Sequence, residues 1–116
     1  MHEVSICESI LRSVRSIVEE NGYVHVASVT LHVGALQMVV PEALDFAFEA
    51  LTRETEFENT ELIQIVKPAR GRCKDCGTEQ ERDSLFSSCE SCGSYQFEMI
   101  SGMELTIAHM EVETDV

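Results

Sequence analysis

The sequence predicts a small α+β fold: a three-stranded sheet covered by two helices, with an inserted zinc-ribbon-like loop module before the last strand. Three observations predict it. Two segments have apolar residues at helical spacing, three have the composition of strands, and four of the five cysteines gather in a segment that has neither pattern. With 116 residues, 44% of them hydrophobic, the chain has room for one modest core but not for two full domains.

Residues 5–21 form the first predicted helix, because apolar side chains recur there three and four positions apart. These side chains are Ile6, Ile10, Leu11, Val14, Ile17 and Val18. Ser5 followed by Glu8 fits a capping box at the start, and Gly22 permits left-handed backbone at the end. We therefore expect residues 1–4 to lie just outside the helix.

A half-buried strand is predicted over residues 26–33, where polar and less polar side chains alternate, and Gly34 is expected to end it. Pro41 suits the first position of a second helix, which continues at helical spacing to about Thr55. Two further strands, rich in Ile, Val and Leu, are predicted over residues 62–67 and 103–112. The order of the strands in the sheet does not follow from these patterns.

The cysteine-rich segment contains two C-x-x-C-G units separated by twelve residues, with Cys73, Cys76, Cys89 and Cys92. Each pair can hold one ion from a tight turn, and two such turns complete the tetrahedron that suits Zn2+. Four thiolates leave no open coordination position, so we expect a structural zinc site. Residues 70–97 are accordingly predicted to be an inserted zinc-binding domain within an α/β domain of residues 1–69 plus 98–116. The connections, residues 68–72 and 98–102, contain turn-forming residues.

Other interpretations of the cysteine pairs stay open at this point: redox-active turns, an iron–sulfur cluster, or a zinc ribbon that binds nucleic acid. The net charge of -13 opposes nucleic acid or an anionic membrane surface as the main partner. Five of the eight basic residues flank the module and would compensate bound thiolates: Lys67, Arg70, Arg72, Lys74 and Arg82. Cys7, in the first helix, is expected to pack as a small hydrophobe.

No stretch approaches the roughly 20 apolar residues of a membrane span, and the N-terminus lacks the pattern of a signal peptide. We therefore expect a cytoplasmic protein whose cysteines bind metal rather than form disulfides. No open-site zinc motif, nucleophile elbow or phosphate loop indicates an enzyme.

The N-terminal Met1-His2-Glu3 can form a second metal site. A free α-amine, the deprotonated amide of His2 and its imidazole can build fused chelate rings around one ion. Such a planar nitrogen set selects Ni2+ or Cu2+ over Zn2+. From these residues alone, an exposed histidine without a metal remains the simpler interpretation.

Several motifs extend almost from one end of the chain to the other: Met1-His2-Glu3, Ile6-Cys7-Glu8, Val33-Gly34-Ala35-Leu36, Phe46-Ala47-Phe48-Glu49 and the paired C-x-x-C units. Together they resemble the HypA/HybF family, the nickel-insertion proteins of NiFe hydrogenase maturation. The resemblance implies a nickel metallochaperone, which carries Ni2+ without catalytic turnover, and a zinc-binding loop on a nickel-binding α/β domain.

Carried over by position, the nickel ligands are the Met1 amine, the backbone nitrogen and imidazole of His2, and the backbone nitrogen of Glu3. The resemblance further implies delivery of nickel to the hydrogenase large-subunit precursor alongside the GTPase HypB, and it leaves a homodimer open. A second class of function shares every cysteine argument: a non-enzymatic zinc-ribbon scaffold or regulatory protein that acts through protein-protein contacts. That alternative predicts no dependence on the N-terminus.

Overall fold

The computed structural model describes residues 2–82 and 87–114, which fold into two compact units. The first, here called the helical unit, draws on Met1–Leu31, Val39–Ile65 and Thr106–Val116. The second, the cysteine unit, draws on His32–Met38 and Val66–Leu105. Within the described residues, neither helix has the length and apolar character needed to cross a bilayer.

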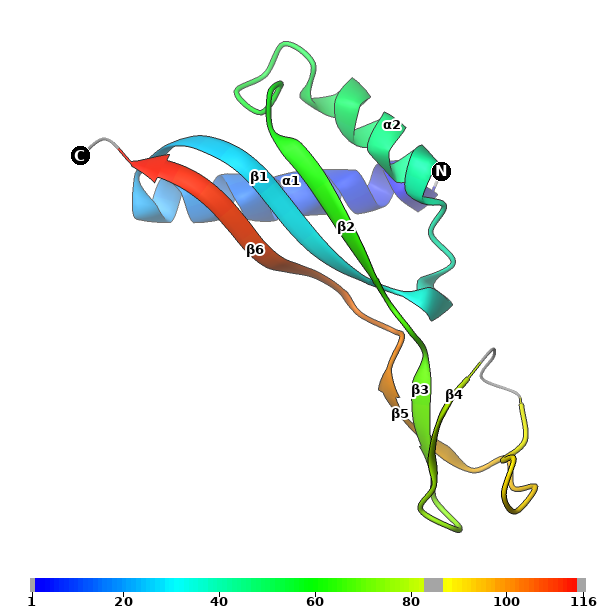
Figure 1. The fold of residues 1–116 in the computed structure, drawn as a ribbon. Helices are drawn as coiled ribbons and strands as arrows, with labels where there is room; N and C mark the ends of the chain where they lie inside the picture. Colours follow the sequence, from blue (N-terminus) through cyan, green and yellow to red (C-terminus); the bar gives the residue numbers. More distant parts are fainter. Residues whose placement is uncertain (1, 83–86, 115–116) are drawn as a thin grey trace. The chain divides into compact units, whose positions relative to one another are not determined.

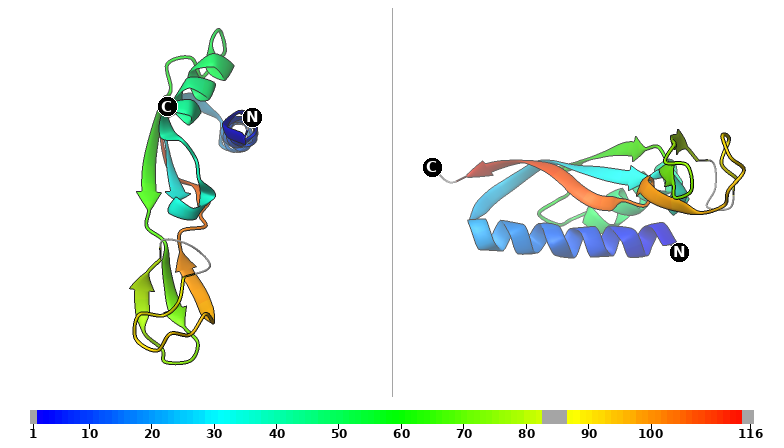
Figure 2. Two further views of the ribbon diagram at one scale, coloured as in Figure 1. Left: turned by 90° about the vertical axis from the view of Figure 1, so that its right-hand side faces the viewer. Right: turned by 90° about the horizontal axis from the view of Figure 1, so that it is seen from below.

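The α+β prediction is confirmed by a three-stranded sheet with two helices on one of its faces (Figures 1 and 2). The sheet has the order β2-β1-β6, and its elements along the chain are α1 (His2–Asn21), β1 (Tyr23–Gly34), α2 (Pro41–Thr52), β2 (Glu61–Lys67) and β6 (Leu105–Thr114). Figure 1 shows β2 parallel to β1 and β6 antiparallel to it. A parallel pair needs a crossover connection, which α2 supplies between β1 and β2.

The first helix begins earlier than predicted. α1 starts at His2, so Ser5 is an exposed residue inside the helix and not its cap. Glu3 accounts for the difference, because a carboxylate in the first turn is stabilised by the unpaired N–H groups and by the helix dipole. The predicted end is confirmed: Gly22 has φ 67°, and its N–H donates to Val18 O at 2.9 Å.

The core of the helical unit lies where the predicted apolar stripes meet. α1 and α2 bury Ile6, Ile10, Leu11, Val14, Leu44, Ala47 and Phe48. Each large aliphatic or aromatic side chain buried in this way contributes roughly 1.5–3 kcal/mol. The prediction that β1 is half-buried is wrong, since Ser28 and Thr30 are buried as well. β1 is the central strand, so its neighbours cover the polar side chains that a half-exposed strand would present to water.

The second helix ends three residues before the predicted limit. α2 stops at Thr52, whose hydroxyl donates to Phe48 O at 2.7 Å, and Arg53 has ψ 129°, outside the helical region. Glu54 then adopts φ 63°, a conformation that cannot continue a helix. The chain turns here and enters β2 at Glu61.

The cysteine unit contains a second three-stranded sheet that the sequence did not predict. Its central strand, β3 (Arg70–Cys73), pairs antiparallel with β4 (Glu79–Glu81) and with β5 (Phe97–Ser101). The segments expected to be turn-forming connections, 68–72 and 98–102, are therefore largely strand. β3 and β4 are short and mostly polar, and β5 is only five residues long, so no apolar alternation is long enough to predict a strand.

Gly34 ends β1 as predicted, and a short 3-10 helix, η1 (Ala35–Gln37), follows it. The N–H of Gly34 donates to Glu104 O at 2.7 Å, and the N–H of Leu36 donates to Gly102 O at 2.9 Å. These bonds bring two glycine backbones into contact, because a Cβ on Gly34 would lie 2.1 Å from Gly102 O. The motif at residues 33–36 thus marks a crossing of two chain segments within the cysteine unit.

Candidate metal centre

The two C-x-x-C-G motifs of the cysteine unit form the same turn. Gly77 N–H donates to Cys73 O at 2.8 Å, and Gly93 N–H donates to Cys89 O at 2.9 Å. The two glycines have φ 78° and 77°, in the left-handed region that glycine enters without steric cost. A second backbone bond closes each turn, from Cys73 N to Thr78 O at 2.9 Å and from Cys89 N to Ser94 O at 2.7 Å.

The four sulfur atoms of these turns form one cluster, in which all lie within 4.8 Å of one another. Sγ of Cys73 is 3.6 Å from Sγ of Cys92, and Sγ of Cys76 is 3.7 Å from Sγ of Cys89. A tetrahedral ion with metal–sulfur distances of about 2.3 Å has sulfur–sulfur edges of about 3.8 Å. The sulfurs therefore fit one tetrahedral ion, whereas a cluster in which each cysteine binds a different iron needs wider spacing.

Gln80 of β4 supports this cluster, although sequence analysis missed it. The side chain is 8% exposed, its amide nitrogen donates to Cys89 Sγ at 3.5 Å, and its amide oxygen accepts from Glu90 N at 3.1 Å. Ser91 N–H also points at Cys89 Sγ, at 3.4 Å. Donors of this kind stabilise a ligating thiolate and fix its orientation.

Two thiols of the cluster have pKa values shifted in opposite directions. The backbone N–H of Cys92, then that of Ser91, lower the pKa of Cys89 to about 6. The Ser94 N–H favours the Cys92 thiolate, but the neighbouring Cys73 sulfur and desolvation outweigh it and raise the pKa of Cys92 to about 12. A ligand to a metal must be a thiolate, and the raised pKa of Cys92 conflicts with that requirement. A divalent ion at the centre would remove that conflict.

Arg82, one of the five basic residues that flank the cysteine module in the sequence, is buried in the cysteine unit. It is 5% exposed, its guanidinium carbon lies 3.5 Å from the centre of the Phe97 ring, and it donates to the carbonyls of Ser87 and Ser88. These carbonyls immediately precede Cys89, so the arginine holds the backbone that leads into the second turn. Its positive charge also suits a site that gathers thiolates.

At the N-terminus, Met1 lies outside the described residues, and His2 and Glu3 form the first turn of α1. The imidazole of His2 is exposed, with Nδ1 3.4 Å from Glu3 Oε2. The same carboxylate oxygen accepts from the backbone N–H of Val40 at 3.4 Å. The N–H groups of Glu3 itself and of Val40 lower the pKa of this carboxyl. Glu3 thus connects the start of α1 to the residue before α2, and nothing in the sequence indicated Val40 as its partner.

The fifth cysteine lies apart from the sulfur cluster, in the core of the helical unit. Cys7 is fully buried, its thiol donates to Leu44 O at 3.5 Å, and desolvation followed by the charge of Asp45 raises its pKa to about 11. A thiol with this pKa is about one-thousandth ionised at pH 8. Without metal the cysteine unit is expected to unfold and expose its four thiols, whereas Cys7 stays buried in the helical unit. We therefore expect Ellman's reagent to label four thiols of the metal-depleted chain quickly and the fifth only at the rate at which the helical unit unfolds. Five equally fast thiols, or a slow phase that survives Cys7→Ala, would contradict this.

Comparison with known proteins identifies the family of this chain. The family model described as "Hydrogenase/urease nickel incorporation, metallochaperone, hypA" matches residues 1–112. The hydrogenase maturation factor HypA of Acidithiobacillus ferrooxidans is 40% identical over 113 residues, covering 97% of this chain and 100% of that protein. The protein of the same name from Geobacter metallireducens is 41% identical over 114 residues, with the same coverage.

Solved structures share the fold at lower identity. The solution structure of the nickel metallochaperone HypA from Helicobacter pylori has a TM-score of 0.73 at 20% identity, covering 99% of this chain and 100% of that one. A second solution structure, of a HypA protein, has a TM-score of 0.74 at 21% identity, covering 99% and 98%. With a family model over nearly the whole chain and relatives at about 40% identity, the chain belongs to the HypA family of hydrogenase maturation factors.

Proposed function

We propose that this chain is a nickel carrier that binds Ni2+ at its N-terminus and passes it, alongside HypB, to the hydrogenase large-subunit precursor. The ligands in this proposal are the Met1 amine, the backbone nitrogen and imidazole of His2, and the backbone nitrogen of Glu3. The four cysteines hold Zn2+ as a structural ion. Membership of a family described by nickel incorporation supports the cargo, and the ligand chemistry rests on the geometry below.

The observation that carries the nickel site is that α1 begins at His2. The N–H groups of the first helical turn have no carbonyl partner inside the helix. The amides of His2 and Glu3 can therefore lose their protons to a metal without breaking a helical hydrogen bond.

Glu3 has a separate role through its side chain. Its carboxylate is 3.4 Å from both His2 Nδ1 and Val40 N, and the side chain is only 13% exposed. This contact holds the imidazole beside the amides of the first turn, and because the fused chelate rings require Nδ1, nickel would take the place of the Nδ1–carboxylate contact. The side chain of Glu3 is thus an orienting group, while its backbone nitrogen is the ligand.

For the cysteine residues, we propose a Zn(Cys)4 site in which residues 70–97 are a zinc-binding domain on a nickel-binding domain of residues 1–69 plus 98–116. Zn2+ fits the tetrahedral thiolate set, and four ligands leave no position for water or substrate. The cysteines are unpaired, which suits the reducing cytoplasm, and we place the protein there.

A nickel titration of the zinc-loaded protein tests the N-terminal site. The untagged chain is compared with a copy that carries a short N-terminal extension, with His2→Ala, and with His109→Ala, which removes an exposed imidazole from β6. We expect the extension and His2→Ala each to weaken nickel binding at least tenfold. His109→Ala should bind nickel as tightly as the untagged chain, and all four proteins should contain the same amount of zinc. Equal nickel binding by all four proteins would refute the site and favour the zinc-ribbon scaffold.

The proposed ligands also set the pH dependence of nickel binding. Amide and imidazole nitrogens must be free of protons before they can bind a metal. Nickel affinity should therefore fall steadily as the pH drops from about 7.5 to about 5.5, because protons compete with the metal for these nitrogens. Isothermal titration at several pH values measures this, and an affinity that does not change over that range would contradict nitrogen ligation.

A further inference from the structure

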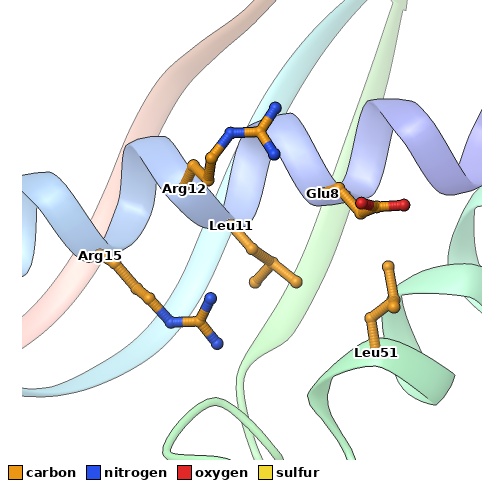
Figure 3. Close-up of a pocket in the computed structure, with 5 residues that line it drawn as sticks. All are labelled: Glu8, Leu11, Arg12, Arg15 and Leu51. Carbon is orange, nitrogen blue, oxygen red and sulfur yellow. The ribbon is translucent and has the colours of Figure 1, made fainter.

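A groove between the two helices of the helical unit is not used by either proposed metal site. It has a volume of about 180 Å3 and is lined by Glu8, Leu11, Arg12, Arg15 and Leu51. Figure 3 shows the first four side chains projecting from α1 and the last from α2. Their positions on α1, at intervals of three and four residues, place them along one face of the helix.

The groove joins an apolar floor to a charged rim. Leu11 is 5% exposed and Leu51 is half-buried, so the two leucines offer aliphatic surface at the bottom and the side. The two arginines and Glu8 are exposed around it. Glu8 and Arg15 are seven residues apart along α1, about 10 Å, which gives the groove an acidic end and a basic end.

The basic end is unusual for this part of the chain. Residues 1–66 carry 11 acidic and 3 basic side chains, and two of the three bases line the groove. The third, Arg53, lies 3.7 Å from Glu49. Arg12 makes no ion pair within 4.0 Å in the described part of the chain. An unpaired cation retained on so acidic a surface is available to an anionic group from outside.

Arg15, the second arginine of the groove, is held in place by neighbouring side chains. Its Nε lies 3.2 Å from Glu56 Oε1, and its guanidinium carbon is 5.5 Å from the centre of the Phe57 ring. The bond to Glu56 uses Nε, so the terminal nitrogens keep donors for a second acceptor. This anchoring lowers the entropy lost when the arginine binds a ligand.

From these observations we propose that the groove is a docking site for a partner protein segment in which an aliphatic side chain adjoins a carboxylate. The aliphatic group packs on Leu11 and Leu51, and the carboxylate is bound by Arg12 with help from Arg15. The planar guanidinium matches a carboxylate with two parallel hydrogen bonds. Glu8 at the opposite end repels a second carboxylate and favours a segment whose other end carries an N–H group or a basic side chain. This site goes beyond the nickel proposal and does not depend on it.

The test uses small probes on the zinc-loaded full chain. 4-Methylpentanoate carries the proposed pair of groups, and 4-methylpentan-1-ol keeps the branched chain but lacks the charge. Binding is followed in NMR spectra of the leucine methyl groups and of the arginine Nε–H groups. We expect 4-methylpentanoate to shift the signals of Leu11, Leu51 and Arg12 with millimolar affinity, at least fivefold more tightly than the alcohol. Raising the salt concentration from 50 to 500 mM should weaken the binding of 4-methylpentanoate and leave the binding of the alcohol unchanged.

Two exposed arginines give the matched comparison. Arg12→Gln removes the unpaired cation from the rim, and Arg53→Gln removes a cation of the same unit that does not line the groove. Arg12→Gln should raise the dissociation constant of 4-methylpentanoate at least fivefold, and Arg53→Gln should leave it unchanged. Equal binding of the carboxylate and the alcohol, equal effects of the two substitutions, or signal shifts outside the groove would each overturn the proposal.

Discussion

Replacing Cys73 by alanine is expected to abolish zinc binding and to unfold the cysteine unit while the helical unit stays folded. Among the described residues of the cysteine unit, the buried hydrophobic side chains are Val33, Ala69, Cys73 and Cys89. A core of this size is too small to hold the unit folded by itself. Zinc bound by four cysteines supplies on the order of 10–16 kcal/mol in small zinc modules, so the ion replaces the missing core.

Metal analysis and amide hydrogen exchange measure this outcome. The variant should contain less than one-tenth of a zinc ion per chain and should lose protection at the amides of β3, β4 and β5, while the amides of α1 keep theirs. Cys7→Ala is the matched control, because it removes a buried thiol outside the sulfur cluster. That protein should keep one zinc and lose only about 1 kcal/mol of stability. One zinc per chain in Cys73→Ala, with β3 to β5 still protected, would refute four-cysteine ligation.

Gly34→Ala is expected to destabilise the folded chain by at least about 3 kcal/mol, the upper end for an overpacked site. Gly34 has φ -68° and ψ 139°, a conformation that alanine adopts easily. Backbone freedom alone would therefore make the substitution slightly stabilising, by about 0.4–1 kcal/mol. The loss comes instead from the new methyl group, which would lie 2.1 Å from Gly102 O, 2.2 Å from Gly102 C and 2.6 Å from Met103 N. These are backbone atoms, so relieving the contact requires the two segments to separate.

Gly22→Ala provides the comparison, because the same methyl group meets no atom within 4 Å there and the cost comes from φ 67° alone. That left-handed strain costs roughly 1–2 kcal/mol. Urea unfolding followed by circular dichroism gives both values, and hydrogen exchange at Leu36, whose N–H bonds Gly102 O, reports on the crossing itself. Gly34→Ala that is no less stable than Gly22→Ala would show that the backbones do not meet this closely.

The sequence predicted best what depends on spacing along the chain. The apolar stripes of α1 and α2 and the four cysteines were all identified, because a helix and a C-x-x-C turn bring together residues that are near neighbours in sequence. The start of α1 was missed for a related reason. Ser5 and Glu8 match a local capping pattern, but Glu3 supplies the favourable charge one turn earlier and bonds to Val40, which is distant in the chain.

What the sequence did not predict depends on contacts between distant residues. β3, β4 and β5 are defined by pairings such as Arg72 with Glu79 and Glu98, which leave no apolar periodicity. Gln80 and Arg82 look like ordinary polar residues until the fold brings one to a sulfur and stacks the other on Phe97. The groove at Arg12 likewise exists only because α2 lies against α1.

The matching turns at the two cysteine pairs show which positions of the motif determine the geometry of the turn. Geometry is specified by the cysteines, the glycine and the hydroxyl residue that follows it, Thr78 or Ser94, which the two turns share. The two intervening positions differ between the turns: one turn has Lys74 and Asp75, the other Glu90 and Ser91. Asp75 accepts a hydrogen bond from Ser94 Oγ of the other turn, whereas Lys74, Glu90 and Ser91 are exposed. Substitution of the exposed Lys74 or Glu90 can therefore change the surface charge beside the metal site without altering a ligand, whereas substitution of Asp75 would also break the bond that joins the two turns.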